Sequence, residues 1–165
     1  MDGFQIVLLE PEIPSNTGNI GRTCVATGSS LHLIDPLGFK LNEKAIQRAG
    51  MDYWDQLKVF RYLDYEDFCS KNPDRKVYFA STKAPRRYTD VVYEEGSFIL
   101  FGKESAGIPE DILYENRDTC IRIPMLGQMR SLNLANSVAI VLYEALRQTG
   151  FRGLESEGHL RTKAW

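Results

Sequence analysis

The sequence predicts an α/β protein with a mainly parallel sheet flanked by helices. Short apolar runs of strand length alternate along the chain with segments that carry helix signals. Strands separated by helices favour parallel pairing. Each helix brings the chain back to the end at which the previous strand began, so the next strand runs in the same direction. The 165 residues suffice for one buried core, and no repeat, linker or low-complexity segment divides them. We therefore expect one domain over residues 1–165, with a polar tail over 152–165 that we expect to be mobile.

The first half of the chain predicts a strand, a helix and a second strand. Phe4–Leu9 and Leu31–Ile34 are apolar runs of the length of buried strands, and prolines follow both of them. Between these runs, Ser15 or Asn16 is a suitable N-terminal cap for a helix, and Gly28 is a suitable residue to end it. This order agrees with a parallel sheet.

The second half predicts further strands and helices. The strands lie at Val77–Ala80, Phe98–Phe101 and Ile121–Ile123, and two short helices lie at Asp64–Lys71 and Pro109–Tyr114. The last helix has the most regular pattern, because its apolar residues recur at spacings of three and four before a glycine: Leu134, Val138, Val141, Leu142, Ala145 and Leu146, then Gly150.

Composition and charge argue against several classes of function. A net charge of -2 and a pI near 5.7 do not suit a protein that coats nucleic acid through bulk charge. No apolar run reaches the roughly 18 residues of a membrane span and no leader is visible, so we expect a cytoplasmic protein. Cys24, Cys69 and Cys120 are an odd number at wide spacing, which favours free thiols. Apart from these cysteines, the chain has only His32 and His159 as typical ligands of transition metals, so we expect no metal site.

Any contact with RNA must therefore be local. The candidates for such a contact are basic side chains, and each of them is equally suited to keeping the surface soluble. The basic side chains lie in three places: Lys83, Arg86 and Arg87 in one loop, Arg22 and Arg130 in glycine-rich segments, and Arg152, Arg161 and Lys163 near the C-terminus.

Three loops rich in glycine or asparagine each follow a predicted strand. The first, Pro11–Arg22, places Asn16 and Asn19 at a helix start, where backbone N–H groups and the helix dipole favour an anion. A phosphate or ribose suits such a loop, and the alternative is an ordinary strand-to-helix turn. The loop matches neither a P-loop nor a complete Gly-x-Gly-x-x-Gly fingerprint, so nucleotide-triphosphate hydrolysis is unsupported.

The second loop, Gly102–Gly107, follows the apolar run Phe98–Phe101. Gly102 lets a flat ligand approach the backbone, because no Cβ is in the way. Glu104 is able to accept hydrogen bonds from a cofactor amine, a ribose or an arginine. The alternative for Glu104 is a carboxylate that faces solvent in a turn. Pro109 is a structural start signal for the next helix.

The third loop runs from Ile123 to Asn136 and opens the last helix. Its Ile-Pro-Met-Leu start exposes backbone and apolar side chains that suit an adenine. Ser131 and Asn133 lie where the helix begins, so Ser131 is either a site residue or only a helix cap. Tyr143, farther along the helix, faces a partner chain or substrate, or it lies in the core.

Together, the order and spacing of these loops resemble the three signature motifs of the SPOUT superfamily, the RNA methyltransferases with a deep C-terminal trefoil knot. The similarity extends from Phe4 to Gly150. It is strongest to the spoU/TrmH-like branch and, within it, to the TrmL family, which 2′-O-methylates the wobble nucleotide, cytidine or modified uridine, of certain leucine tRNAs. The minimal length and three segments carry this narrower resemblance: Leu9–Asn19, Arg48–Tyr53 and Val141–Ala145.

The resemblance implies that S-adenosylmethionine binds where the C-terminal segment passes through a loop. It also implies an obligate homodimer that recognises the anticodon loop of tRNA without a separate RNA-binding domain, with Arg22 near the subunit boundary. The residues implied for cofactor binding are Ala80, Gly102, Glu104, Ile123, Met125, Ser131 and Leu132. Those implied around the reacting ribose are Asn16, Arg22, Ser131 and Asn133, with Asn19, Arg130 and Tyr143 in further contacts with the substrate.

The implied reaction requires no metal. A sulfonium already carries an activated methyl group, so the protein has to align a ribose 2′-oxygen and remove its proton. A 2′-hydroxyl acceptor would also distinguish RNA from DNA. The family matches Arg22 to the base, yet a guanidinium stays protonated. Its alternative role is to bind the adjacent phosphate and lower the pKa of the attacking hydroxyl.

Three other functions remain open at the level of sequence. The first is 2′-O-methylation at another tRNA or rRNA site. The second is a noncatalytic RNA-binding module, which would not need an intact cofactor pocket. The third is a nicotinamide dehydrogenase, which would need a complete glycine fingerprint and an acidic ribose ligand about 20 residues onward.

Overall fold

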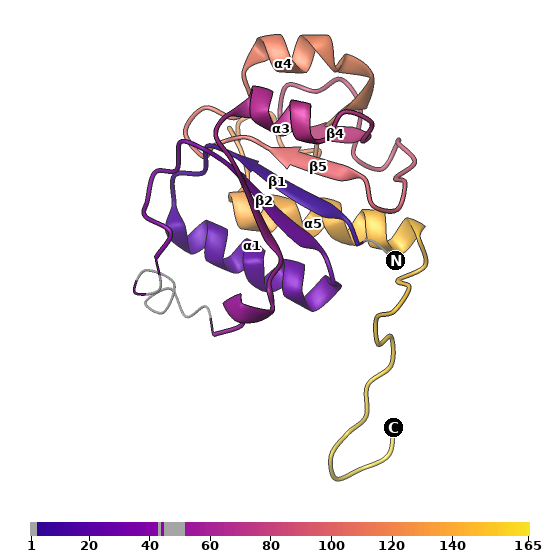
Figure 1. The fold of residues 1–165 in the computed structure, drawn as a ribbon. Coiled ribbons are helices and arrows are strands. Elements are labelled where there is room, and N and C mark those ends of the chain that lie inside the picture. The colour runs from indigo at the N-terminus through magenta and orange to yellow at the C-terminus, as the bar shows by residue number, and fades with distance from the viewer. Residues whose placement is uncertain (1–2, 43, 45–51) are drawn as a thin grey trace.

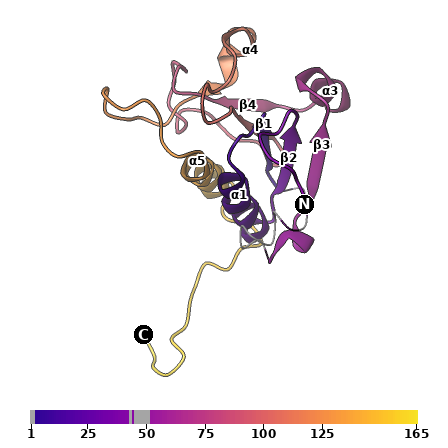
Figure 2. The same ribbon diagram turned by 90° about the vertical axis from the view of Figure 1, so that its left-hand side faces the viewer.

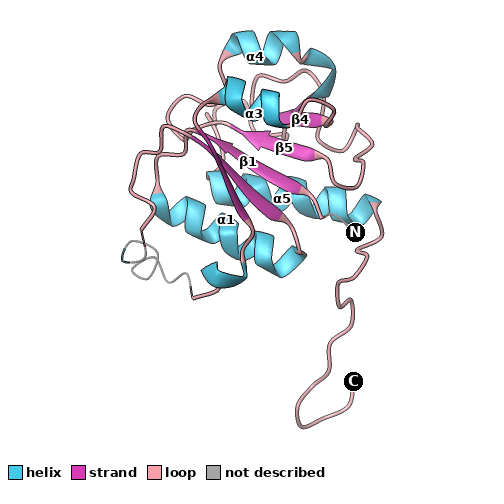
Figure 3. Ribbon diagram, viewed as in Figure 1, coloured by secondary structure: helices cyan, strands magenta, loops and turns pink. Residues whose placement is uncertain are grey.

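The computed structural model describes residues 3–42, 44 and 52–165 (Figure 1). Most of the segment Arg48–Tyr53, which contributes to the narrower resemblance, lies outside these residues. Strands and helices alternate along the chain (Figure 3). The strands are β1 (Gln5–Leu9), β2 (Ser30–Ile34), β3 (Val59–Tyr62), β4 (Val77–Ala80), β5 (Phe98–Phe101) and β6 (Cys120–Ile121). The helices are α1 (Pro14–Thr27), α3 (Tyr65–Lys71), α4 (Glu110–Glu115) and α5 (Leu134–Gln148), with short 3-10 turns η1 (Trp54–Gln56) and η2 (Arg117–Thr119).

All strands in the described ranges belong to one parallel sheet, in the order β3-β2-β1-β5-β4-β6. Gln5 of β1 lies beside Ser30 of β2 on one side and beside Phe98 of β5 on the other. After β1 the chain continues to β2 and β3, which lie on one side of β1. After β5 it continues to β6, which lies on the opposite side of the sheet. Parallel sheets hold their ligands at such a point, outside the carboxyl ends of the strands.

Both faces of the sheet are covered by helices. Alternate side chains of a strand point to opposite faces, so Ile6 and Leu8 belong to one core and Val7 and Leu9 to the other. The first core contains the apolar faces of α1 and α5, which lie side by side (Figures 1 and 2). The second contains side chains of α3 and α4. The α/β prediction with a mainly parallel sheet is therefore confirmed.

Strand β3 was not predicted from the sequence. It is an edge strand, paired only with β2 within the described residues, and Phe60 and Arg61 face solvent. Arg61 makes a 2.9 Å ion pair with Asp35. Because edge strands expose one side, β3 lacks the continuous apolar run that marks the buried strands.

The helix and strand ends differ slightly from their predictions. Helix α1 ends at Thr27, and Gly28 follows with a left-handed φ of 67°, as predicted. Strand β6 ends at Ile121, two residues before the predicted end. Beyond it, Arg122 pairs with Arg87 in an isolated bridge, and Ile123 leaves the sheet.

After α5 the chain forms no further helix or strand. Phe151 and Leu154 still pack against the first core, and residues 155–165 run away from the body of the molecule as an exposed tail (Figures 1 and 2). Cys24 and Cys120 are buried free thiols and Cys69 is an exposed one. Among the residues described, no helix has the length and apolar character needed to cross a bilayer.

Candidate active site

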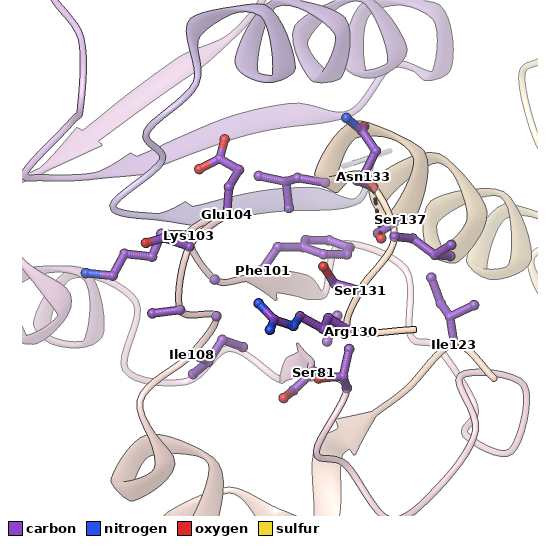
Figure 4. Close-up of a pocket in the computed structure, with 18 of the residues that line it drawn as sticks. Ser81, Phe101, Lys103, Glu104, Ile108, Ile123, Arg130, Ser131, Asn133 and Ser137 are labelled. Carbon is purple, nitrogen blue, oxygen red and sulfur yellow. Dashed lines mark hydrogen bonds between the residues drawn. The ribbon is translucent and has the colours of Figure 1, made fainter. Parts of the chain in front are cut away.

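The three loops meet around one pocket at the carboxyl ends of the strands (Figure 4). Its volume is about 560 Å³, within the range of roughly 300–1,000 Å³ typical of small-molecule sites. Strand ends contribute buried apolar residues to its lining, namely Phe101 of β5 and Ile121 of β6, and α5 contributes Val141. Segments far apart in the sequence thus share one pocket because their strands are neighbours in the sheet.

Glu104 connects the second loop to the start of α1. Its Oε2 accepts a 2.8 Å hydrogen bond from the N–H of Glu12, and its Oε1 accepts from the N–H of Ile13 and from Nδ2 of Asn16, both at 3.2 Å. Ile13 is the N-cap of α1 and offers no side-chain acceptor. Glu104 therefore satisfies backbone donors at this helix start from 92 positions away. Glu104 is thus bonded to the protein and is not a free turn carboxylate.

The predicted cap of α1 is therefore wrong. The helix begins at Pro14, one residue before Ser15, and neither Ser15 nor Asn16 caps it. The side chain of Asn16 contacts the other loops instead. Its Oδ1 accepts a 3.0 Å hydrogen bond from Nδ2 of Asn133 in the third loop.

Asn133 also caps α5. Its Oδ1 accepts a 3.2 Å hydrogen bond from the N–H of Asn136, so the alternative that Ser131 is only the cap of this helix is wrong. Glu104, Asn16 and Asn133 form a chain of hydrogen bonds that joins the three loops.

A second set of contacts fixes the first loop to the second. Ser105 donates two hydrogen bonds to the carboxylate of Glu12, from its N–H at 3.0 Å and from its hydroxyl at 2.8 Å. These bonds hold the pKa of Glu12 below its usual value. Lys103 Nζ lies 3.2 Å from Oε2 of Glu10. Each loop thus supplies a carboxylate that accepts backbone hydrogen bonds from the other loop.

The second loop is a turn too tight for a side chain at Gly102. A Cβ there would lie 2.1 Å from the carbonyl carbon of Gly107. Gly107 has a φ of +70°, and its N–H donates a 2.8 Å hydrogen bond to the carbonyl of Lys103. The close approach of Gly107 therefore requires a glycine at position 102. Gly102 lines the pocket, and the approach of a flat ligand to its backbone stays a prediction.

Most of the residues predicted for the site line this pocket. All those predicted for cofactor binding are among them. The side chains of Arg130, Ser131 and Asn133 lie around it in Figure 4. The complete set is Asn16, Ala80, Gly102, Glu104, Ile123, Met125, Arg130, Ser131, Leu132 and Asn133.

Three predicted residues do not line the pocket of their own chain: Arg22, Asn19 and Tyr143. Arg22 is six positions after Asn16, which is about 240° around a helix of 3.6 residues per turn. Its side chain is 65% exposed, lies 3.8 Å from Asp52 and stacks over the ring of Tyr53. Asn19 is exposed on α1, and Tyr143 is 47% exposed on α5, so Tyr143 is not a core residue.

The pocket also contains polar residues that were not singled out from the sequence. Ser81 and Thr82 follow β4, and Ser137 lies in the first turn of α5, where its hydroxyl donates a 3.1 Å hydrogen bond to the carbonyl of Asn133 (Figure 4). Their position directly after a strand could have identified Ser81 and Thr82, because ligands bind at the carboxyl ends of parallel strands. Within the described ranges, no group of histidine, cysteine, aspartate and glutamate side chains has the arrangement of a metal site.

Known proteins resemble this chain along most of its length. Residues 3–143 match the SpoU rRNA methylase family. A tRNA (cytidine(34)-2′-O)-methyltransferase from Saccharophagus degradans is 45% identical over 151 residues, which cover 91% of this chain and 98% of the relative.

Solved structures resemble this fold as well. One described as giving structural insights into the 2-OH methylation of C/U34 on tRNA is 39% identical with a TM-score of 0.84, over 92% of this chain and 99% of that chain. An AdoMet-bound rRNA methyltransferase from Sinorhizobium meliloti is 27% identical with a TM-score of 0.77, over 88% of this chain and 56% of that chain. The family match spans the three loops and their pocket. The chain therefore belongs to the SpoU family of RNA methyltransferases.

Proposed function

We propose that this protein transfers a methyl group from S-adenosylmethionine to the ribose 2′-oxygen of the wobble nucleotide of leucine tRNAs. The observation that carries the proposal is the pocket in which Glu104, Asn16 and Asn133 join the three loops. The relatives support nucleotide 34, since one is named for cytidine 34 and one structure is described for C/U34. Cytidine or a modified uridine is the proposed acceptor. The choice of leucine tRNAs rests on the sequence resemblance.

The pocket suits S-adenosylmethionine in size and in the chemistry of its lining. Gly102 offers backbone without a Cβ, and Ile123, Met125 and Leu132 offer apolar contact for an adenine. Glu104 retains acceptor capacity for a ribose hydroxyl, because a carboxylate has about four lone-pair sites. When bound, S-adenosylmethionine supplies a methyl group on a cationic sulfur.

The polar residues of the pocket would align the acceptor ribose. Asn16 and Asn133 hold each other in fixed orientations, and Ser131 adds a hydroxyl at the same wall. Arg130 supplies a cation for the neighbouring phosphate. Anticodon-loop nucleotides are unpaired, so presenting the ribose requires less energy than extracting a nucleotide from a duplex.

The proposed active unit is a homodimer in which Arg22 of one subunit serves the pocket of the other. Arg22 lies on a face of α1 away from its own pocket, with its side chain largely in solvent. On the neighbouring helix α5, Ile140 and Tyr143 expose apolar surface that a second subunit would cover. The guanidinium stays protonated, so its proposed role is to bind phosphate and lower the pKa of the attacking hydroxyl.

The proposal extends to the architecture of the chain. Family membership and the sequence resemblance support a deep trefoil knot in the C-terminal segment. They also support one catalytic domain over residues 1–165, acting on tRNA in the cytoplasm. True knots are rare in proteins, so the pattern of strands and helices alone does not justify one.

The experiment that tests the function is transfer of labelled methyl from S-adenosylmethionine to unmodified leucine tRNA, with mass spectrometry of the product nucleosides. We expect a 2′-O-methylated nucleotide at position 34 and no transfer to the same tRNA carrying 2′-deoxyribose there. Methylation at another tRNA or rRNA position would replace the substrate and keep the family. Absence of S-adenosylmethionine binding would overturn the enzymatic proposal.

A further inference from the structure

A second concavity lies beside the pocket, on the other side of Lys83. Its volume is about 410 Å³, and it lies between the segment Lys83–Pro85 and α4. Lys83 lines both hollows, so the two are adjacent. Helix α4 covers the face of the sheet opposite α1 and α5 (Figure 1). A dimer built on α1 and α5 therefore leaves this second concavity open to solvent.

The floor of the concavity is buried and apolar. Ala84, Leu113 and Cys120 line it and are almost inaccessible to water. The thiol of Cys120 donates to the carbonyls of Leu113, at 3.4 Å, and Asn116, at 3.3 Å. These contacts fix α4 against β6, so the hollow is formed in the absence of a ligand.

The rim carries an exposed aromatic ring and two cations. Tyr114 is 76% exposed, although it lines the concavity. Arg117 is exposed, and in the part of the chain described it has no ion-pair partner, whereas Lys83 makes a 2.7 Å ion pair with Glu110. Asp111 also lines the concavity, so the rim carries two cations and two carboxylates. Equal numbers of opposite charges mean that net charge alone would not attract a polyanion here.

We propose that this concavity, the α4 site (Lys83, Glu110, Leu113, Tyr114, Arg117 and Cys120), binds an unpaired nucleotide of the substrate RNA that flanks the methylated one. This inference rests on the proposed function and names a further contact of its substrate. Tyr114 stacks on the base, and Arg117 binds the adjacent phosphate. Lys83 lies on the path between the two hollows, where the connecting backbone would pass.

The chemistry of the rim favours single-stranded RNA. Unpaired bases present flat faces, which proteins bind by stacking on aromatic side chains next to basic residues. The carboxylates of Glu110 and Asp111 suit the exocyclic amino groups of bases, as acidic side chains do for cytosine. Stacking and hydrogen bonds account for binding at a site whose charges cancel.

The test compares Tyr114→Ala and Arg117→Gln with matched controls in full-length protein. Leu63→Ala removes a similarly exposed side chain beyond the opposite edge of the sheet, and Arg75→Gln removes an exposed arginine at the amino end of β4. We expect each α4-site variant to raise the KM for tRNA, and the Kd for a fluorescent anticodon stem-loop, roughly tenfold. The kcat and the affinity for S-adenosylmethionine should stay unchanged, and Tyr114→Trp should retain binding.

The outcomes separate this inference from the proposed function. Wild-type KM and Kd values in both variants, with methylation intact, would overturn the α4 site alone. A loss with Arg117→Gln and none with Tyr114→Ala would overturn the base contact. If the wild type binds the stem-loop without methylating tRNA, the proposed function fails and the Kd values still decide the α4 site. If the wild type does not bind RNA, the α4 site is overturned as well.

Discussion

The side-chain amide of Asn133 donates a 3.0 Å hydrogen bond to Oδ1 of Asn16, 117 positions earlier in the chain. Asn16 uses its own NH₂ group for Glu104, and Asn133 uses its Oδ1 for the N–H of Asn136. Rotating either amide by 180° would place like groups against each other at both ends. The wall of the pocket is therefore held by side chains with one allowed orientation.

Replacing Asn133 should separate its two contacts. Asn133→Ala removes the cap of α5 and the bond to Asn16, so we expect the free energy of unfolding in urea to fall by about 1–2 kcal/mol. Asn133→Ser keeps a capping oxygen but is too short to replace the amide contact, so it should recover part of the stability. Equal loss in both variants would show that the cap contributes little.

Gly102→Ala should abolish binding of S-adenosylmethionine, measured by calorimetry, because a Cβ would lie 2.1 Å from the carbonyl carbon of Gly107. Gly127→Ala is a matched control in the third loop, where a Cβ meets nothing within 4 Å. We expect the control to bind normally. Normal binding by Gly102→Ala would show that the second loop does not form the cofactor wall.

The contact between Glu12 and Ser105 should make stability depend on pH. Ser105 holds the pKa of Glu12 below the ordinary 4.5, so the stabilisation is complete above this value and is lost as pH falls through the lower folded-state pKa. Glu12→Gln should therefore lower the melting temperature at pH 7, and the difference should shrink as the pH falls below 4.5 and through the lower folded-state pKa. In a Ser105→Ala background, Glu12→Gln should have a much smaller effect at pH 7. A constant difference across pH would contradict this account.

Mixed dimers should show whether Arg22 acts across the subunit boundary. Arg22→Ala should cost far more turnover than cofactor binding, and we expect Ser131→Ala homodimers to be inactive as well. A co-expressed mixed dimer contains one site with an intact pocket and the partner's intact Arg22, so about half of the wild-type activity should return. Inactive mixed dimers would place Arg22 at its own pocket.

Local patterns predicted much of the fold. The apolar periodicity of α5 and the continuous runs of β1 and β5 depend on neighbours within a few residues, and both were correct. Gly102 was predicted to admit a flat ligand, whereas in the structure the close approach of Gly107 requires a glycine there. Strand β3 was missed because an edge strand has no such run.

Contacts between residues far apart in the sequence could not be predicted from local patterns. Glu104 binds the backbone N–H groups just before α1 from 92 positions away, so a plausible local cap at Ser15 or Asn16 was predicted instead. The resemblance grouped Arg22 with the pocket residues, whereas the geometry of α1 turns it outward. Its proposed role in catalysis requires a second subunit, which neither a local pattern nor one chain contains.

The long span between Asn16 and Asn133 also constrains how the protein is made. The first loop leaves the ribosome well before the third loop and α5, which lie more than a hundred residues later in the chain. The nascent chain therefore cannot assemble the pocket until the residues of α5 have been translated. Ligand affinity becomes a property of the finished fold, and a bound ligand stabilises the whole molecule against unfolding by mass action, not one loop alone.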